Sequence, residues 1–258
     1  SSVSGYTSGG MTGIPSPDDR SIIDKFPFAS DGNATDVGDL TIFFSGYGRI
    51  HTSGQSSADN GYVSGGTSNN YEKSVDKFPF SSDANATDMG DLIETLNTTA
   101  GQSSADNGYV SGGKNASAGS IDVNIIQKFP FASDSNATDV GDLTIDRSGS
   151  CGQSSSVSGY NSGGFNGAQT ATIDKFSFSS DGNSTYVSDL SKTNWNGAGQ
   201  SSADNGYHSG GYNSGNTVTN EIDKFPFASD DNATDIGDLT LARFQISGQS
   251  STTSGYVS

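Results

Sequence analysis

Residues 75–92 read Val-Asp-Lys-Phe-Pro-Phe-Ser-Ser-Asp-Ala-Asn-Ala-Thr-Asp-Met-Gly-Asp-Leu, and four near-copies of this stretch occur elsewhere in the 258-residue chain. Each copy leads through a short link into Gly-Gln-Ser-Ser and a Gly-Tyr segment. The first phenylalanine of the copies recurs at spacings of 52, 51, 47 and 49 residues: Phe26, Phe78, Phe129, Phe176 and Phe225. Self-similarity at this period is typical of blades or stacked units, because one unit cannot bury its apolar face without neighbours. Residues 1–258 are therefore predicted to form a single domain of five repeats.

Each repeat is predicted to hold about four short antiparallel strands and no helix. In the second repeat, residues 75–80 alternate apolar and polar side chains, as a half-buried strand does. Pro79 lacks a backbone donor and favours a strand end, and residues 82–85 favour a tight turn. Gly65-Gly66 indicates a turn with positive φ. The remaining strand segments are 61–66, 89–93 and 100–104. Four strands in about 50 residues favour a β-propeller blade.

The two ends of the chain carry similar sequences, since residues 1–8 match residues 251–258 at five of eight positions. The interpretation we favour is a five-bladed β-propeller whose ends close the ring, with the strand from Gly255-Tyr256 pairing into the first blade. Such closure protects strand edges that would otherwise promote association. The alternative is that these residues belong to a longer array or assembly.

The composition excludes several classes of partner. A formal net charge of −17 with only 12 Lys and Arg residues argues against binding nucleic acid or anionic lipid. No apolar run is long enough for a membrane span, so membrane insertion is not expected. The single cysteine, Cys151, excludes an intrachain disulfide and occupies a position where other repeats hold Ser or Ala.

The repeat resembles a kelch-type unit. The resemblance rests on a strand ending in Gly-Gly, a strand whose Phe precedes an Asp/Asn turn, and a third element followed in two repeats by Arg147 and Arg243. It implies a β-propeller fold. The repeat is also similar to tandem repeats of bacterial and phage-virion surface proteins, which implies an extracellular or virion-surface setting.

The acidic turn of each repeat is a candidate calcium site, because Ca²⁺ accepts carboxylate and amide oxygens in a flexible shell. The alternative is that Asp and Asn cap turns and tie repeats together through backbone hydrogen bonds. No cofactor other than calcium is expected. The candidate ligands are Asp31, Asn33, Asp36, Asp39, Asp83, Asn85, Asp88, Asp91, Asp134, Asn136, Asp139, Asp142, Asp230, Asn232, Asp235 and Asp238.

Glycosylation sequons recur in the same turns and in two of the links. In a secreted eukaryotic protein they would be glycan acceptors on exposed turns, whereas in a bacterial or viral product they would usually be bare. The acceptor residues are Asn33, Asn85, Asn97, Asn115, Asn136, Asn183 and Asn232.

Enzymatic interpretations find little support in the sequence. Kelch-fold copper oxidases use His, Tyr and Cys groups, but this chain has only His51 and His208, and we expect neither to belong to a shared constellation. No nucleophile elbow and no phosphate-binding loop followed by Lys is present. We therefore expect no enzyme activity.

The repeats differ mainly in the link between Gly-Gly and Lys-Phe, which places the variation on one face of the predicted ring, where propellers usually bind ligands. Aromatic groups beside Asn and Gln suit sugar rings or a protein partner. The first repeat adds an aromatic insertion that is a second contact candidate. The candidate ligand-binding residues are Tyr71, Phe165, Tyr212 and Asn213 in the links, with Phe43, Phe44 and Tyr47 in the insertion.

The sequence thus predicts a non-enzymatic structural or attachment module of an extracellular or virion surface, which presents one variable loop face to a protein or glycan partner and can self-assemble. One alternative is a glycan-binding lectin with repeated sites between blades. The other is a kelch-like oxidase.

Overall fold

The computed structural model describes residues 1–12, 18–19, 21–41, 48–68, 72–115, 117, 119–215 and 217–258. Every regular element among these residues is a β-strand, and all paired strands are antiparallel. The predicted all-β class is therefore confirmed. The described residues contain no helix of the length and apolarity that a membrane crossing requires.

Four repeats form the same four-stranded sheet, in which the strands follow one another in chain order. We number the sheets I to V in chain order and name each boundary by the two sheets that meet there. In sheet II the strands are β6 (Ser53–Ser56), β7 (Asn60–Ser64), β8 (Ser74–Pro79) and β9 (Thr87–Asp91). Sheet III holds β11 (Ala100–Ser103), β12 (Asn107–Ser111), β15 (Ile125–Pro130) and β16 (Thr138–Asp142). Sheet IV holds β17 (Cys151–Ser154), β18 (Ser158–Ser162), β19 (Thr172–Ser177) and β20 (Thr185–Asp189). Sheet V holds β22 (Ala198–Ser201), β23 (Asn205–Ser209), β25 (Glu221–Pro226) and β26 (Thr234–Asp238).

The two ends of the chain form incomplete versions of this sheet. Sheet I has three strands, β1 (Ser4–Ser8), β4 (Ile22–Pro27) and β5 (Thr35–Asp39), and the described residues give it no counterpart of β6. The C-terminal hairpin consists of β27 (Gly248–Ser250) and β28 (Gly255–Val257). In this hairpin Gln249 lies opposite Tyr256, as Gln55 lies opposite Tyr62 in sheet II.

The glycines of the repeat allow two close approaches. Gly61 of β7 lies opposite Phe78 of β8, and a Cβ on this glycine would lie 2.3 Å from Cζ of the phenylalanine ring. Gly101 of β11 lies against the neighbouring strand β6, and its Cβ would lie 2.4 Å from the carbonyl oxygen of Gly54. The first glycine lets the ring lie flat across its sheet, and the second lets successive sheets approach.

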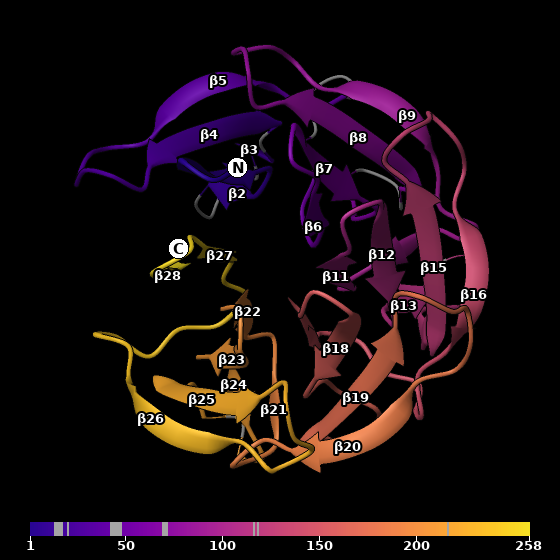
Figure 1. Ribbon diagram of the computed structural model, residues 1–258, viewed down its shortest axis with the longest axis vertical. Coiled ribbons are helices and arrows are strands. Elements are labelled where there is room, and N and C mark those ends of the chain that lie inside the picture. Colours follow the sequence, from indigo (N-terminus) through magenta and orange to yellow (C-terminus); the bar gives the residue numbers. More distant parts are fainter. Residues whose placement is uncertain are drawn as a thin grey trace.

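The sheets follow one another around a ring in sequence order (Figure 1). The Gly-Gln-Ser strands lie toward the middle, where β6 contacts β11, β11 contacts β17, β17 contacts β22 and β22 contacts β27. The strands β5, β9, β16, β20 and β26 lie outside. The C-terminal hairpin contacts both β22 of sheet V and β1 of sheet I, so it lies between the two ends of the series.

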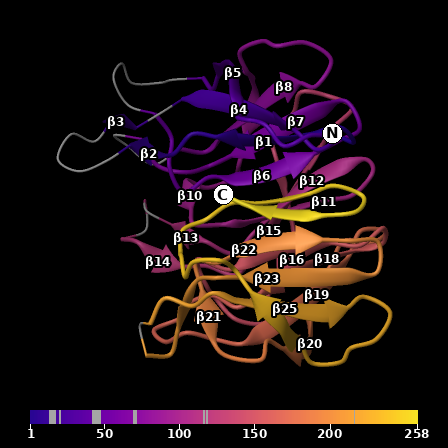
Figure 2. The ribbon, with the colours of Figure 1, turned by 90° about the vertical axis from the view of Figure 1, so that its left-hand side faces the viewer.

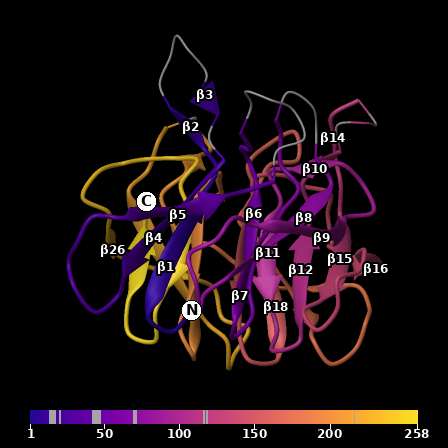
Figure 3. The same cartoon turned by 90° about the horizontal axis from the view of Figure 1, so that it is seen from above.

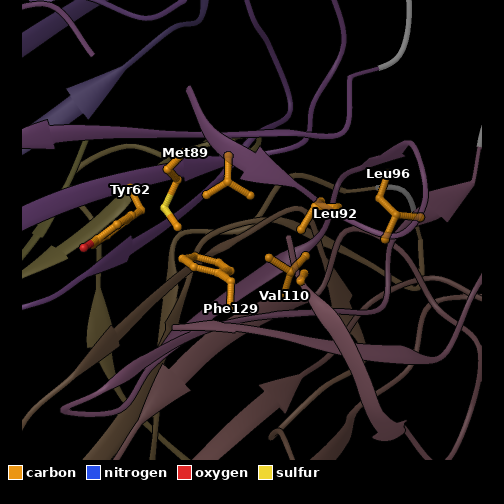
Figure 4. Packing of buried hydrophobic residues seen from close by; sticks show 8 residues of the cluster. Tyr62, Met89, Leu92, Leu96, Val110 and Phe129 are labelled. Carbon is orange, nitrogen blue, oxygen red and sulfur yellow. The ribbon is translucent and has the colours of Figure 1, made fainter. Parts of the chain in front are cut away.

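The apolar core is divided among the boundaries between successive sheets. At the II/III boundary, Tyr62, Met89 and Leu92 of the second repeat face Val110 and Phe129 of the third (Figure 4). Equivalent clusters fill the I/II, III/IV and IV/V boundaries. Each repeat therefore buries its apolar side chains against the next repeat, as the periodicity predicts.

Short strands form a further layer at the end of the molecule opposite the N-terminus (Figures 2 and 3). They come from the links and from the segments after the last strand of each sheet, so the variable links do gather at one end. The strands are β2 (Met11–Thr12), β3 (Asp18–Asp19), β10 (Leu96–Asn97), β13 (Lys114–Asn115), β14 (Ile121–Asp122), β21 (Asn194–Trp195) and β24 (Tyr212–Asn213).

The expected closure by the terminal strand differs from the structure. Among the described residues, β28 pairs with β27 and forms no ladder with β1 or β4 of sheet I. The hairpin pairing is local, so it needs less loop-closure entropy than pairing with a strand at the other end of the chain. The terminal strand does contact sheet I through its side chain, since the ring of Tyr256 stacks on Phe28 at a centroid distance of 5.0 Å.

Candidate functional site

A row of four aromatic rings crosses the IV/V boundary. The Phe165 and Trp195 ring centroids lie 5.3 Å apart, Trp195 and Tyr212 lie 5.7 Å apart, and Tyr212 and Phe244 lie 4.2 Å apart. Phe244 is 38% exposed, and the other three rings are half-buried. We call these four residues the aromatic row.

Local pairing holds the aromatic row in place. Trp195 lies opposite Tyr212 in the pair β21–β24, and Asn194 lies opposite Asn213. Phe165 is fixed by isolated bridges to Ser148 and Gln169. Half-buried rings with amide groups nearby offer an apolar surface together with hydrogen-bonding groups, an arrangement suited to a sugar ring or a partner side chain.

The structure brings three of the predicted ligand-binding residues together, Phe165, Tyr212 and Asn213. Sequence reasoning missed Trp195 and Phe244. Both occupy the same position in consecutive repeats, directly after Asn194 and Arg243, and this shared position is the signal that could have identified them. The other predicted contacts, Tyr71, Phe43, Phe44 and Tyr47, lie outside the described residues.

A polar cavity of about 630 Å³ lies among the inner strands. The Gly-Gln-Ser segments of β6, β11, β17, β22 and β27 line it, together with β1. The amide groups of Gln55, Gln102 and Gln153 each donate a hydrogen bond to the backbone of the next sheet. The described lining residues include no carboxylate, imidazole or amine side chain.

The predicted calcium residues lie at the outer edges of the sheets and join each sheet to the next. The carboxylate of Asp83 pairs with Lys25 at 3.1 Å, and Asn85 Oδ1 accepts a hydrogen bond from the backbone N–H of Asp39. Equivalent ion pairs join Lys77 with Asp134, Lys128 with Asp181, and Lys175 with Asp230. Equivalent Asn bonds come from Asn136, Asn183 and Asn232.

The remaining acidic residues of the turns act locally. Asp36, Asp88, Asp139 and Asp235 each accept a hydrogen bond from the backbone N–H two residues later. Over the described part of the chain, no three His, Cys, Asp or Glu side chains gather in a way that could hold a metal ion. The contacts seen in these turns are those expected from the turn-capping alternative.

The predicted glycan acceptors fall into two groups. The five in the acidic turns are exposed: Asn33, Asn85, Asn136, Asn183 and Asn232. Asn97 and Asn115 are buried, and their amides donate hydrogen bonds to Thr67 and Glu94. A glycan on either of these two would have to fit at a buried position.

Cys151, Ser162 and His208 meet in the interior. His208 Nε2 lies 3.8 Å from Sγ of Cys151, and its Nδ1 lies 3.1 Å from Oγ of Ser162. The expectation that His208 belongs to no constellation is therefore wrong. Burial raises the pKa of Cys151 to about 12 and lowers the pKa of His208 to about 4, so both groups are neutral at neutral pH. A buried neutral thiol is a poor nucleophile.

Two buried ion pairs cross sheet boundaries. Arg49 contacts Asp76 at 3.0 Å across the I/II boundary, and Arg147 contacts Asp174 at 2.9 Å across the III/IV boundary. Arg147 and Asp174 are 0% exposed. Each arginine also donates to backbone carbonyl groups of the next sheet, among them Ser74 and Thr172.

Comparison of the chain with models of known protein families and with curated proteins finds no match.

Proposed function

We propose that the protein is a non-enzymatic attachment module of an extracellular or virion surface, in which the sheets act as the blades of a β-propeller. The ligand is a carbohydrate bound on the aromatic row. The observation that supports this proposal is the aromatic row itself. It places four rings from two repeats side by side, and its strands β21 and β24 belong to the layer of short strands where the links gather (Figure 2).

The chemistry of the interior supports a binding function over a catalytic one. Hydroxyl, amide and backbone groups of the Gly-Gln-Ser segments line the central cavity, together with aromatic and small apolar side chains. The interior thiol and imidazole, Cys151 and His208, are neutral and enclosed, so they offer no activated nucleophile.

The contacts at the sheet boundaries favour one carbohydrate site over repeated sites between blades. Stacked Tyr and Phe rings and Lys–Asp pairs already occupy the repeated positions at the boundaries from I/II to IV/V. The rings of the aromatic row belong to two repeats only.

Trp195 allows a direct test, because it is the only tryptophan of the chain. Titration of the protein with carbohydrates identified on a glycan array should shift or quench the Trp195 fluorescence to saturation. Tyr212→Ala should weaken binding by about tenfold or more, since a stacked aromatic contact is a typical binding hot spot. Tyr186→Ala removes an exposed ring on the outer strand β20 and serves as the control. An array without binders, or binding that Tyr212→Ala leaves unchanged, contradicts the proposal.

A further inference from the structure

The position between sheets V and I is only half occupied. The C-terminal hairpin has the register of the two inner strands of a sheet, and its Tyr256 packs on Phe26 and Phe28 as Tyr6 packs on Phe78 and Phe80. It therefore forms the inner half of a sixth sheet. In sheets II to V the counterpart of β28 pairs on both sides, whereas β28 has one partner strand among the described residues.

A cavity of about 470 Å³ lies where the outer half of this sixth sheet would stand. Sheet V lines it with Tyr207, Ile222, Ile236 and Leu239, and the hairpin contributes Val257. These four residues of sheet V hold the positions that Tyr62, Val75, Met89 and Leu92 hold at the II/III boundary. Ile236 is 49% exposed, whereas Met89, its counterpart under sheet III, is 4% exposed. This face of sheet V thus has the side chains of a sheet boundary, but no strands of the described chain cover it.

The polar groups of this face also lack the partners that their counterparts have. The lysines of sheets I to IV each pair with an aspartate of the next sheet, whereas Lys224 of sheet V has no ion pair among the described residues. The backbone N–H groups of four aspartates each donate a hydrogen bond to an Asn side chain of the next sheet: Asp39, Asp91, Asp142 and Asp189. For Asp238, the fifth member of this series, no such bond is present in the described chain.

Arg243 indicates which residue would face it in strands that cover this cavity. At the I/II boundary both Thr41 and Arg49 bond to Asp76, and at the III/IV boundary both Thr144 and Arg147 bond to Asp174. At the II/III boundary Leu96 holds the position of the arginine, and Gln127 holds the position of the aspartate. The fifth repeat carries Thr240 and Arg243, both of which line the cavity. Among the described residues, the side chain of Arg243 bonds to the backbone carbonyl of Leu241 and forms no ion pair. We therefore expect an aspartate opposite Arg243 in any segment that covers it.

We propose that this cavity binds a β-hairpin with the outer-strand sequence of the repeat. Its first strand has the pattern Asp-Lys-Phe-x-Phe and pairs with the free edge of β28. By the register of sheet II, the first Phe of the pattern lies opposite Gly255, the Lys opposite Tyr256 and the Asp opposite Val257. The two phenylalanines pack on Tyr207, the aspartate pairs with Arg243, and an aspartate of the following turn pairs with Lys224.

The direct test is calorimetric titration of the full chain with a synthetic peptide of residues 74–92, which contains Asp76, Phe78 and Phe80. We expect saturable binding of one peptide per chain. The peptide carrying Asp76→Asn should bind about thirtyfold or more weakly, because it leaves Arg243 without its charged partner. The peptide carrying Phe78→Ala and Phe80→Ala should not bind measurably.

The chain variant Arg243→Leu provides the matched control, because it copies the Leu96 arrangement. This variant should lose its preference for the Asp76 peptide and instead prefer the Asp76→Gln peptide, which copies Gln127. Equal affinity of the parent chain for the Asp76 and Asp76→Asn peptides would overturn the proposal, as would a preference that Arg243→Leu leaves unchanged.

A second measurement covers the case in which the free peptide is too disordered to bind. A copy of residues 210–239 appended after Ser258 should raise the midpoint of thermal unfolding by several degrees. The same extension with its two phenylalanines replaced by alanine should not. If neither the peptide nor the extension has an effect, the proposal fails. It also fails if sedimentation shows that the unextended chain covers this face by dimerising, with Ile236→Asp abolishing the dimer.

Discussion

The II/III and III/IV boundaries use the same backbone positions with different chemistry. At III/IV, Arg147 forms a buried ion pair with Asp174, whereas at II/III the corresponding residues are Leu96 and Gln127. At these two boundaries the arginine and the aspartate are replaced together, whereas at IV/V the arginine position holds Asn194 and the aspartate, Asp223, remains and bonds to Ser191. The repeat sets the backbone and the apolar contacts, while the side chains at the buried polar position vary.

The difference has an energetic basis. A buried ion pair gains little net stability, because desolvation offsets most of the attraction, but removal of one partner leaves a buried charge without compensation. An apolar residue beside a neutral amide avoids that desolvation. The two boundaries are therefore expected to be comparable in stability while each remains matched.

The largest effect is expected for the mismatched variant Arg147→Leu. Because Asp174 is fully buried, loss of its partner should lower the free energy of unfolding by about 3–5 kcal/mol. The double variant Arg147→Leu/Asp174→Gln, which copies the II/III boundary, should recover most of the loss. Urea denaturation at pH 7 measures both. A double variant no more stable than Arg147→Leu alone would show that the two positions do not vary as a pair.

The second effect compares a covered boundary with the half-occupied one. Leu143→Ala removes a side chain that is 3% exposed at the III/IV boundary and should cost about 2–4 kcal/mol. Leu239→Ala makes the same change at the equivalent position of sheet V, where the side chain is only half-buried, and should cost about 1 kcal/mol. Chemical denaturation of both variants gives the difference. Equal losses would mean that the face of sheet V is already covered.

The third effect is a pH dependence that comes from one repeat. The folded protein keeps His208 neutral, since burial lowers its pKa to about 4 from the ordinary 6.5, whereas the unfolded chain binds a proton below that ordinary value. The stabilising contribution is therefore present above pH 6.5 and is lost as the pH falls toward 4, by at most about 3 kcal/mol.

His208→Val copies Val63 and Val110, which hold this position in sheets II and III. The variant should be less sensitive to acid between pH 6.5 and 4, as measured by urea denaturation at several pH values. If the parent and the variant respond to acid with the same slope, His208 is not the group that titrates.

The smallest effect is expected at the outer ion pairs. Lys128 and Asp181 lie 2.5 Å apart, but Asp181 is 59% exposed, so water screens the attraction. Lys128→Ala should change the free energy of unfolding by about 0–1 kcal/mol, and by less at high salt. A loss of the size expected for Arg147→Leu would place the main attachment between sheets at their outer edges instead of at the buried pair.

The strands of the repeat could be predicted from the sequence. The sequence also contained a signal, not used above, for the different buried side chains at the sheet boundaries. The segments predicted at 61–66, 75–80 and 100–104 match β7, β8 and β11 to within two residues, and β8 ends at Pro79 as expected. Gly65 and Gly66 have the positive φ that their turn predicted. Leu96 and Gln127 depart from the repeat together, and five internal copies make such a paired departure visible without homologues.

The remaining features depend on tertiary contacts. Cys151 and His208 are 57 residues apart, and nothing local indicates that they meet. The aromatic row depends on how the short strands β21 and β24 pair. The place of the C-terminal hairpin depends on competition between its local partner β27 and the distant strand β1, and the matching ends of the sequence do not decide this competition.

The central claim is that the repeats form a ring in which the C-terminal hairpin reaches the first sheet. Nuclear Overhauser contacts between selectively labelled Tyr and Phe rings test it most directly, because Tyr256 and Phe28 are far apart in sequence but stack at 5.0 Å. We expect cross-peaks from Tyr256 to Phe26 and Phe28 that Tyr256→Leu removes. Their absence in the parent chain, with Tyr256 shifts typical of an unstructured segment, would contradict the account.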